Sequence, residues 1–456
     1  MDLQGKRVLV VGLGRTGEAA ARFLLKRGAR VVISETKTAA ELGPAASAWA
    51  GRGAVLEAGG HNLSSFLAAD LIIPSPGVPP LPEIAAARER GIPVLSEIEI
   101  AFRCLKGRLI GVTGTNGKST TTTLLHKILK ESGRRAILAG NIGTPLLSFS
   151  EKSRDDDIYV IEISSFQLEH IESFRVHLAV VLNLSQNHLD WHGSFDAYAA
   201  AKLKLVAGQG PDAVAVLNRD DAAVWGMRTA APGAVLGFSR RRILGRGAFV
   251  RDGWIVVRDG GPERPICPVT DIRLPGLHNR ENVLAAALAA SLEGVPARRI
   301  RASVRTFRGL EHRLESVLTL GGVAYVNDSK ATTVEAAIRA IESFDRPVIL
   351  ILGGKDKGLD FTKLRRIVKA RVKSIVLVGA AKEKIRAALD GAVPMAEAGP
   401  FSEVVPLAAG AASRGDVVLL APACTSWDMF KSFEERGRVF KRDVRRLAAR
   451  SKRRKG

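Results

Sequence analysis

The fold is decided by residues 108–130, which read RLIGVTGTNGKSTTTTLLHKILK. An apolar, strand-like run leads into a glycine-rich turn, and a helix-like segment at 121–130 follows it. Glycines let backbone N–H groups turn inward around phosphate oxygens, and a helix that begins there directs its positive end at them. The order of strand, glycine turn and helix therefore predicts a phosphate-binding loop in a parallel sheet.

Two side chains of this turn have a specific chemistry. Lys118 can reach the β- and γ-phosphates of ATP, and the Ser119 hydroxyl can ligate Mg²⁺. The strict pattern GxxxxGK[ST] requires glycine at position 112, where the chain has valine, so the loop is a variant. A glycine turn without a ligand is the weaker alternative, because a Lys-Ser pair opens the helix. We expect ATP to contact Gly114, Thr115, Asn116, Gly117, Lys118, Ser119 and Thr120.

Length and patterning set the number and class of domains. A chain of 456 residues suggests about three domains of roughly 150 residues each. Strand-like runs that continue into alternating strand and helix patterns begin near residues 7, 108 and 322. This alternation predicts the α/β class, with parallel sheets covered by helices. We place the domains at 1–97, 98–308 and 309–456, and we expect 238–265 to form an exposed excursion with a hairpin.

The charge of the chain is large and uneven. The formal net charge is +22, and residues 436–456 hold eleven Lys or Arg against the single acid Asp443. Such a surplus is typical of nucleic-acid or membrane partners. Aromatic residues make up only 5% of the chain, and no basic segment is rich in stacking residues, so nucleic acid is not expected. We expect the basic tail after Phe440, residues 441–456, to be a solvated, frayed end.

The cysteines and apolar runs indicate the compartment. Cys104, Cys267 and Cys424 lie far apart and form no CxxC pair, which favours a reducing cytosol over a disulfide framework or zinc ribbon. No run approaches the roughly 20 apolar residues that span a bilayer, and no targeting segment is evident. We expect a soluble, cytoplasmic protein without a membrane span.

A second glycine signature, GLGRTG at 12–17, follows the first strand. Glu35 ends the next strand, roughly 20 residues on, where an acid that binds a ribose lies in dinucleotide sites. Alone, the motif predicts an NAD-dependent dehydrogenase. Beside a phosphate-binding loop it is ambiguous, because the same turn can hold any nucleoside diphosphate.

Polar side chains also follow other strands, where open α/β sheets bind ligands. Glu162 ends the run 158–163 and His188 follows the run 178–183, so both are candidate ligands of Mg²⁺. Three further polar stretches occupy 276–282, 327–333 and 422–428. Helix capping by Asn279 and by Asp328 is an alternative for the first two.

Together these segments resemble the Mur ligase family, up to about Phe440. The phosphate loop resembles the ATP loop of that family, which characteristically lacks glycine at the position of Val112. The segments DSKAT and PACTS favour the members that add D-glutamate. The other matching segments are GNIG at 140–143, EISSFQLE at 162–169, GLHNREN at 276–282, GLEHRLE at 309–315 and KSFEERG at 431–437.

The resemblance implies two Rossmann-like domains that flank a central P-loop domain with a parallel or mixed sheet. It implies that UDP-N-acetylmuramoyl-L-alanine, rather than NAD, contacts Arg15, Thr16, Glu35, Thr36, Ser75, Gly77 and Asn141. It places Asn279 and Asn282 at the adenine, and it assigns Arg313 and Asp328 to ATP. For D-glutamate it implies Thr332, Lys357, Ser426 and Phe433.

The resemblance also implies the metal site and the chemistry. Glu162 would ligate the first of two Mg²⁺ ions and His188 the second, together with Ser119. Lys202 would carry a carbamate formed from CO₂. The implied reaction is ATP-dependent addition of D-glutamate through an acyl phosphate in peptidoglycan precursor synthesis, by a monomer. The alternatives are a sibling amino-acid-adding or folylpolyglutamate-type ligase, an NAD-dependent dehydrogenase and a basic nucleic-acid-binding ATPase.

Overall fold

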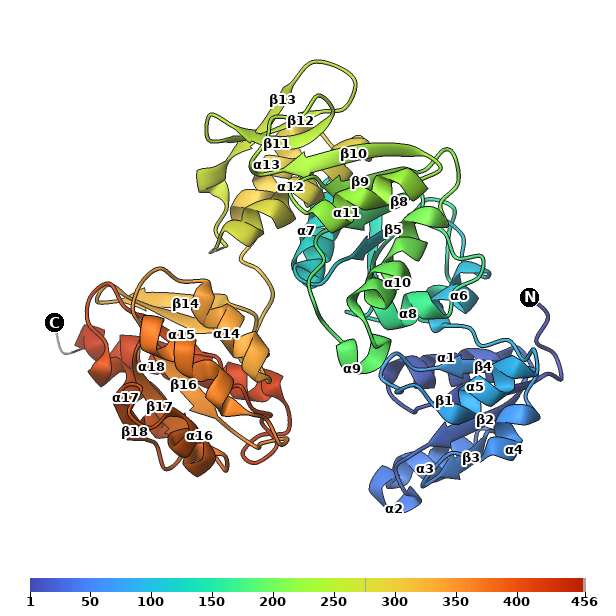
Figure 1. The fold of residues 1–456 in the computed structure, drawn as a ribbon, viewed down its shortest axis with the longest axis horizontal. Coiled ribbons are helices and arrows are strands. Elements are labelled where there is room, and N and C mark those ends of the chain that lie inside the picture. Colours follow the sequence, from blue (N-terminus) through green and yellow to red (C-terminus); the bar gives the residue numbers. More distant parts are fainter. Residues whose placement is uncertain (275, 454–456) are drawn as a thin grey trace. The chain divides into compact units, whose positions relative to one another are not determined.

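The computed structural model describes residues 1–274 and 276–453. Its contacts divide the chain into two compact units, of which the first holds Met1–Ile272 and His278–Arg305 and the second holds Arg273–Leu277 and Thr306–Gly456. The described residues form three sheets with helices on their faces (Figure 1). The predicted α/β class with parallel and mixed sheets is confirmed, whereas the domain boundaries near residues 97 and 308 remain predictions.

The first sheet of the first unit has the order β3-β2-β1-β4, and its neighbouring strands are parallel. Because β1 (Arg7–Val11) is covered on both faces, Val8–Val11 is fully buried, which explains its continuous apolar run. Strands β2 and β3 follow on one side of β1 in the strand order, and the chain then crosses to the other side of β1 to form β4 (Leu71–Pro74). The remaining elements are α1 (Arg15–Lys26), β2 (Arg30–Glu35), α2 (Ala39–Leu42), α3 (Pro44–Ala50), β3 (Val55–Ala58), α4 (Leu63–Leu67) and α5 (Pro82–Glu89).

The second sheet of this unit has nine strands in the order β13-β12-β11-β10-β9-β8-β5-β7-β6. The seven strands from β11 across to β6 in this order, β5 included, are parallel to one another, whereas β12 and β13 are antiparallel additions beside β11. The strands are β5 (Arg108–Thr113), β6 (Arg135–Gly140), β7 (Asp157–Glu162), β8 (Leu178–Val181), β9 (Val214–Asn218), β10 (Ala234–Ser239), β11 (Gly247–Arg251), β12 (Trp254–Arg258) and β13 (Arg264–Pro268). The helices are α6 (Glu97–Phe102), α7 (Lys118–Glu131), α8 (Ser165–Glu169), α9 (Leu189–His192), α10 (Phe195–Ala207), α11 (Ala222–Gly226), α12 (Leu277–Leu292) and α13 (Ala297–Thr306).

Residues 238–265 contain the predicted hairpin, in which Arg251 pairs with Trp254. The segment is less of an excursion than expected, because β11 continues the main sheet beside β10. Phe249, Ile255 and Val257 are fully buried. Ala248 and Phe249 are buried side by side, as are Ile255, Val256 and Val257, so short continuous apolar runs bury both faces of these strands and join them to the sheet.

The sheet of the second unit has the order β14-β15-β19-β16-β17-β18, with β14 antiparallel at one edge and the other neighbours parallel. Its strands are β14 (Glu315–Leu320), β15 (Val323–Asn327), β16 (Val348–Gly353), β17 (Val372–Val378), β18 (Met395–Glu397) and β19 (Val417–Leu420). Its helices are α14 (Val334–Glu342), α15 (Arg365–Arg371), α16 (Lys382–Leu389), α17 (Val404–Ala411) and α18 (Phe433–Arg453). Within the described part of the chain, no helix has the length and apolar character to cross a membrane.

Candidate active site

The phosphate loop lies between β5 and α7, as the sequence predicts. Gly117 has a φ of +82°, and a Cβ at this position would lie 2.1 Å from Oδ1 of Asn282. Asn282 in turn donates to Oδ1 of Asn279 at 3.0 Å. Only glycine therefore fits beside these two asparagines, and α12 lies directly against the loop. Helix capping by Asn279 is wrong, because this residue lies inside the first turn of α12.

Lys118 and the neighbouring strand hold the loop in shape. The Lys118 ammonium donates to the carbonyl oxygens of Gly114 and Thr115 at 3.0 and 2.9 Å. From the end of β8, the Asn183 side chain accepts from Asn116 N at 2.8 Å and donates to the Asn116 carbonyl at 3.1 Å. Ser119 is buried at the start of α7, and Thr120 follows it. Asn183 was missed, although a polar residue directly after a buried strand was available as a signal.

A cluster of buried polar side chains adjoins the loop. Glu162 ends β7, and its Oε1 accepts from Nδ2 of Asn141 at 2.7 Å. Lys202 projects from α10, is 1% exposed and donates to Thr113 Oγ1 at 3.1 Å. Its Nζ also lies 4.8 Å from the centre of the Tyr198 ring. The four-residue spacing places Tyr198 and Lys202 on one face of the helix, so the sequence contained a signal for Tyr198 that was not used.

The environment of Lys202 favours its neutral form. Burial lowers the pKa of Lys202 well below its ordinary value, the nearby Lys118 charge lowers it further, and Glu162 acts in the opposite direction. A neutral amine is a nucleophile, whereas an ammonium group is not. Lys202 can therefore react with an electrophile that reaches this cluster.

Glu162 and Ser119 provide oxygen atoms of the kind that Mg²⁺ prefers. Oε2 of Glu162 is buried and has no hydrogen-bond partner among the described residues. The same part of the chain holds no cluster of three His, Cys, Asp or Glu side chains that could form a complete metal site. Mg²⁺ commonly binds through one or two carboxylates and completes its shell with phosphate and water oxygens. An unpartnered carboxylate oxygen beside a phosphate loop fits that pattern.

Two histidines near this cluster have opposite environments. His188 is exposed, has a φ of +54° and precedes α9, and its ring lies edge-on to Phe166 at 4.8 Å. The His192 side chain is buried between Oε1 of Glu169 at 2.9 Å and the Ser165 hydroxyl at 3.0 Å. His188 is thus the histidine that a ligand can reach. The sequence does not distinguish the two, because burial depends on α8.

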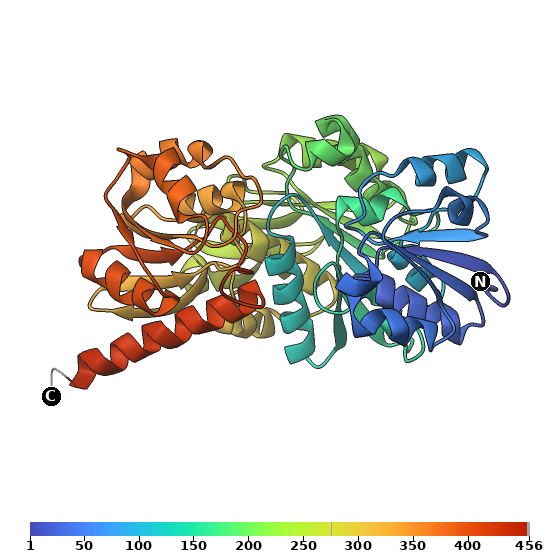
Figure 2. The ribbon, with the colours of Figure 1, turned by 90° about the horizontal axis from the view of Figure 1, so that it is seen from below.

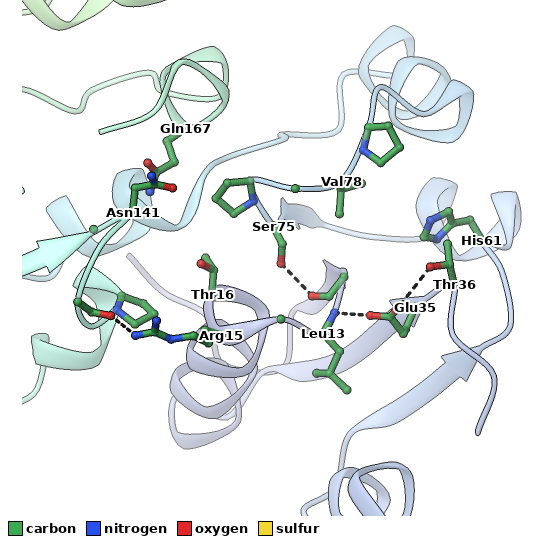
Figure 3. A pocket seen from close by; sticks show the side chains of 18 residues that line it. Leu13, Arg15, Thr16, Glu35, Thr36, His61, Ser75, Val78, Asn141 and Gln167 are labelled. Carbon is green, nitrogen blue, oxygen red and sulfur yellow. Dashed lines mark hydrogen bonds between the residues drawn. The ribbon is translucent and has the colours of Figure 1, made fainter. Parts of the chain in front are cut away.

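A cavity of about 460 Å³ lies where β1 and β4 diverge, at the switch point of the first sheet (Figure 3). Residues of the second sheet's domain complete its wall, and the Arg15 guanidinium donates to the Gly143 carbonyl across it. All seven residues expected at the UDP-linked substrate line it: Arg15, Thr16, Glu35, Thr36, Ser75, Gly77 and Asn141. The structure brings these residues together, while their contacts with a substrate remain a prediction.

Glu35 is fixed inside this cavity. Its carboxylate accepts from Leu13 N at 2.7 Å and from Lys37 N at 3.0 Å. Burial acts to raise the pKa of Glu35, but these two hydrogen bonds, with smaller contributions from Thr36 and the Lys37 charge, leave the pKa below its ordinary value. The acid is therefore ionised and can accept hydrogen bonds from ligand hydroxyl groups.

Sequence reasoning missed other lining residues, notably His61 and Gln167 (Figure 3). His61 Nδ1 lies 2.8 Å from the Ser34 hydroxyl. The Gln167 carbonyl oxygen accepts from Ser164 N at 2.9 Å in a capping box at the start of α8. The Ser-x-x-Gln spacing signals the cap, but nothing in it signals the cavity.

In the second unit, Arg313 lies just before β14 and Asp328 directly after β15. Because these two strands pair antiparallel, with Glu315 opposite Asn327, the two residues lie close together. Oδ1 of Asp328 accepts from Leu314 N at 3.2 Å. Burial raises the pKa of Asp328 to about 6, and the Leu314 hydrogen bond and the charges of Arg313 and Lys330 oppose the rise. Asp328 is not a helix cap, because Thr333 caps α14 by accepting from Ala336 N.

Three of the four residues expected at D-glutamate lie on loops and Phe433 begins α18; one buried arginine connects these segments. Arg436, fully buried on α18, donates to the Ser329 hydroxyl and carbonyl and to the carbonyls of Cys424 and Thr425, at 2.9–3.2 Å. Thr425 pairs with Lys355, and Ser329 donates to the Phe433 carbonyl at 2.8 Å. These contacts join the loops that carry Thr332, Lys357 and Ser426 to the start of α18 at Phe433.

Three family models match successive parts of the chain. They are the Mur ligase MurD-like N-terminal domain at residues 6–96, the Mur ligase middle domain at 112–290 and the Mur ligase glutamate ligase domain at 312–424. The chain is similar to the UDP-N-acetylmuramoylalanine–D-glutamate ligase of Acidobacterium capsulatum, with 50% identity over 97% of this chain and 96% of the relative. It is 46% identical to the protein of the same name from Koribacter versatilis, over 99% and 100% of the two chains.

Solved structures agree with the fold. A UDP-N-acetylmuramate–alanine ligase from Thermotoga maritima matches with a TM-score of 0.57 at 17% identity, over 97% of this chain and 99% of that one. A pseudomurein peptide ligase type C from Methanothermus fervidus matches with a TM-score of 0.56 at 18% identity, over 96% and 100%. With three family models in series and close relatives over nearly the full length, the chain belongs to the Mur ligase family.

Proposed function

We propose that this protein joins D-glutamate to UDP-N-acetylmuramoyl-L-alanine in the cytoplasm, with conversion of ATP to ADP and phosphate. The cofactors of the proposal are two Mg²⁺ ions and a carbamate on Lys202, and the protein acts as a monomer in peptidoglycan precursor synthesis. The names of the relatives at 46–50% identity support the choice of amino acid and acceptor.

The observation that carries the proposal is the position of Asn141. Its side chain lines the cavity of the first sheet and donates to Glu162 beside the phosphate loop. A UDP-linked acceptor in the cavity would thus extend toward the γ-phosphate of ATP on the loop. A ligase that activates the acceptor needs this proximity, because the acceptor carboxylate and the γ-phosphorus must meet.

The proposed chemistry begins with activation of the acceptor. A carboxylate is a poor electrophile because its oxygen is a bad leaving group, and attack of the carboxylate on the γ-phosphorus gives an acyl phosphate and ADP. Lys118 neutralises the charge that is carried by the transferred phosphoryl group. Mg²⁺, bound by Ser119, Glu162 and His188, would supply further charge neutralisation. The neutral amine of D-glutamate then attacks the acyl carbon, and phosphate leaves.

Lys202 has a separate part in the proposal. Its neutral amine adds to CO₂, so that a nitrogen–carbon bond forms, a proton leaves and a carbamate results. The carbamate supplies anionic oxygens where the ammonium form would repel a metal ion. The burial of Lys202 and its low pKa beside Lys118 support this assignment.

The direct experiment supplies UDP-N-acetylmuramoyl-L-alanine, ATP, Mg²⁺ and one amino acid at a time. We expect release of ADP and formation of the amide product with D-glutamate, and little product with L-glutamate. Release of ADP with L-alanine or another amino acid alone would instead identify a sibling ligase.

The carbamate is tested with Lys202→Ala and with Lys204→Ala as its matched control. Lys204 is two residues away on α10, is exposed and donates only to the Glu169 carbonyl among its described hydrogen bonds. We expect Lys202→Ala to lose nearly all turnover and to regain part of it with acetate or formate, while Lys204→Ala stays active. Full activity of Lys202→Ala without a carboxylate would disprove the carbamate.

A further inference from the structure

The outward face of α18 is almost entirely arginine. Between residues 438 and 450 the exposed positions are one alanine, Ala449, and five arginines, Arg438, Arg442, Arg445, Arg446 and Arg450. At 100° per residue these positions share one face of the helix, and at 1.5 Å per residue they span about 18 Å. The face is therefore a stripe of guanidinium groups that covers an arc of about 140° on one side of the helix.

Little within the unit neutralises this stripe. Asp443, the only acid between residues 438 and 450, lies 3.2 Å from Arg442 and 3.6 Å from Arg446. Among the described residues, Arg438, Arg445 and Arg450 form no ion pair within 4 Å; only Arg438 has an acid nearby, because its charge contributes to the lowered pKa of Glu311. Like charges four residues apart on a helix repel one another and destabilise it. An anion from outside the chain would relieve that repulsion.

The opposite face of α18 packs against the core of the second unit. Phe440 and Val444 are fully buried in the core of the second unit, and Leu447 packs against the same cluster. The helix lies along the outside of its unit and its last turns run past the sheet (Figure 2). The fold of the unit therefore uses the apolar face of α18, and between residues 438 and 450 Ala449 is the only exposed apolar residue that could insert into a partner.

We propose that the arginine face of α18 adsorbs to an anionic membrane surface, with the guanidinium groups bound to lipid phosphates. A lipid headgroup layer offers phosphates in a plane, so that arginines on one side of a helix can contact several at once, and guanidinium groups bind phosphate with paired hydrogen bonds. The binding is electrostatic adsorption without insertion. It does not depend on the proposed ligase reaction.

Nucleic acid fits this face less well. Apart from Ala449, its exposed positions are arginines, and it offers no Asn or Gln to read base edges and no aromatic ring on which a base could stack. Phosphate contacts alone would remain. A nucleic acid is thus the competing ligand that the experiment has to distinguish.

The experiment is co-sedimentation of the full chain with phosphatidylglycerol vesicles at 0.15 M salt, with phosphatidylcholine vesicles as the neutral comparison. The test variant is R438Q/R445Q/R450Q, which removes the three arginines without an ion-pair partner. The matched control is R298Q/R299Q/R305Q, which removes three exposed arginines from α13 in the first unit. Each basic residue near an anionic surface contributes roughly a fivefold factor in affinity, so we expect the test variant to bind about a hundredfold more weakly.

The remaining results decide between the proposal and its rivals. We expect the α13 control to bind vesicles like the unaltered chain, both variants to keep ligase turnover, and binding to fall steeply as salt rises. Equal weakening in the two variants would show that total charge, and not the α18 face, causes adsorption. Absence of binding to phosphatidylglycerol, or displacement from it by an equal phosphate concentration of duplex RNA, would overturn the proposal.

Discussion

The two glycine turns of the first unit share a topology and differ in the charge placed beside them. Each connects the first strand of its sheet to the helix that directly follows that strand, and each lies at the point where strand order reverses. At the turn after β1, the Glu35 carboxylate accepts from Leu13 N. At the turn after β5, the Lys118 ammonium donates to two loop carbonyls.

This difference indicates how one backbone motif can suit two kinds of ligand group, a sugar and a triphosphate. A carboxylate that occupies a loop N–H removes one phosphate donor and presents an acceptor for hydroxyl groups, which suits a sugar. A lysine that donates to the loop carbonyls occupies none of the loop's N–H groups, although Asn183 accepts from two of them, and it adds positive charge, which suits a triphosphate. The glycines build both turns, and we expect the charged neighbour to select the ligand of each.

The largest effect is expected at the lysine turn. Lys118→Ala should lower ADP release in the presence of both substrates by about a thousandfold, since it removes a cation from the phosphoryl-transfer site. Steady-state kinetics with a coupled ADP assay measure this. A loss of less than tenfold would mean that the two turns do not differ as described.

The glycine turn after β1 should tolerate a side chain at one position and not at another. A Cβ at Gly17 would lie 1.9 Å from the Gly12 carbonyl oxygen, whereas at Gly14 it would meet nothing within 4 Å. We expect Gly17→Ala to lower the free energy of unfolding by about 3 kcal/mol or more. Gly14→Ala, as the control in the same urea titration, should change it by less than about 1 kcal/mol; equal costs would contradict the close approach of α1 and β1.

The connection between the two domains of the first unit should respond to pH through Glu97. Burial raises the pKa of this carboxyl to about 7, against the opposing hydrogen bond from Leu147 N. From pH 4.5 to 7 the folded chain keeps a proton that the unfolded chain has lost, so the free energy of unfolding should fall as pH rises, by at most about 3 kcal/mol.

The measurement is urea unfolding of Glu97→Gln at pH 5 and pH 8. Glutamine keeps the neutral form at every pH, so this part of the decline should vanish. Glu89→Gln, at an exposed position of α5, serves as the control and should keep the decline. The same pH dependence in both variants would exclude Glu97 as its source.

The smallest effect is expected at the acid of the first turn. Glu35→Gln keeps the shape of the side chain but loses the charge, so we expect the KM for the UDP-linked substrate to rise about tenfold. The KM for ATP should stay unchanged, because Lys118 and its loop belong to the other turn. If both KM values rise together, the two turns do not act on separate ligands.

The strand ends and the glycine turns that position the candidate site residues could be predicted from local sequence. The ends of β2 at Glu35 and of β7 at Glu162 lie where the apolar runs stop, and α7 begins at Lys118 directly after the glycine turn. Strand ends and glycine turns depend on neighbouring residues, which is why they could be predicted. The roles of the site residues remain predictions that the substrate experiments will test.

Other features depend on residues far apart in the chain. His188 and His192 look alike in sequence, yet Glu169 and Ser165 bury only the second. Arg436 reaches Ser329 across 107 positions of the chain, and no local pattern predicts such a contact. The strands at 247–258 were expected to form an exposed excursion. They are buried because β11 pairs with β10, and the local sequence does not show that pairing.

Arg436 has a consequence for how the protein is made. The loops after β15 and β19 rest on a guanidinium that belongs to the last helix. During translation, both loops leave the ribosome before the side chain that orders them. A chain interrupted before Arg436 would carry every residue assigned to D-glutamate but lack the group that holds their loops, so only products extended through α18 should bind the amino acid.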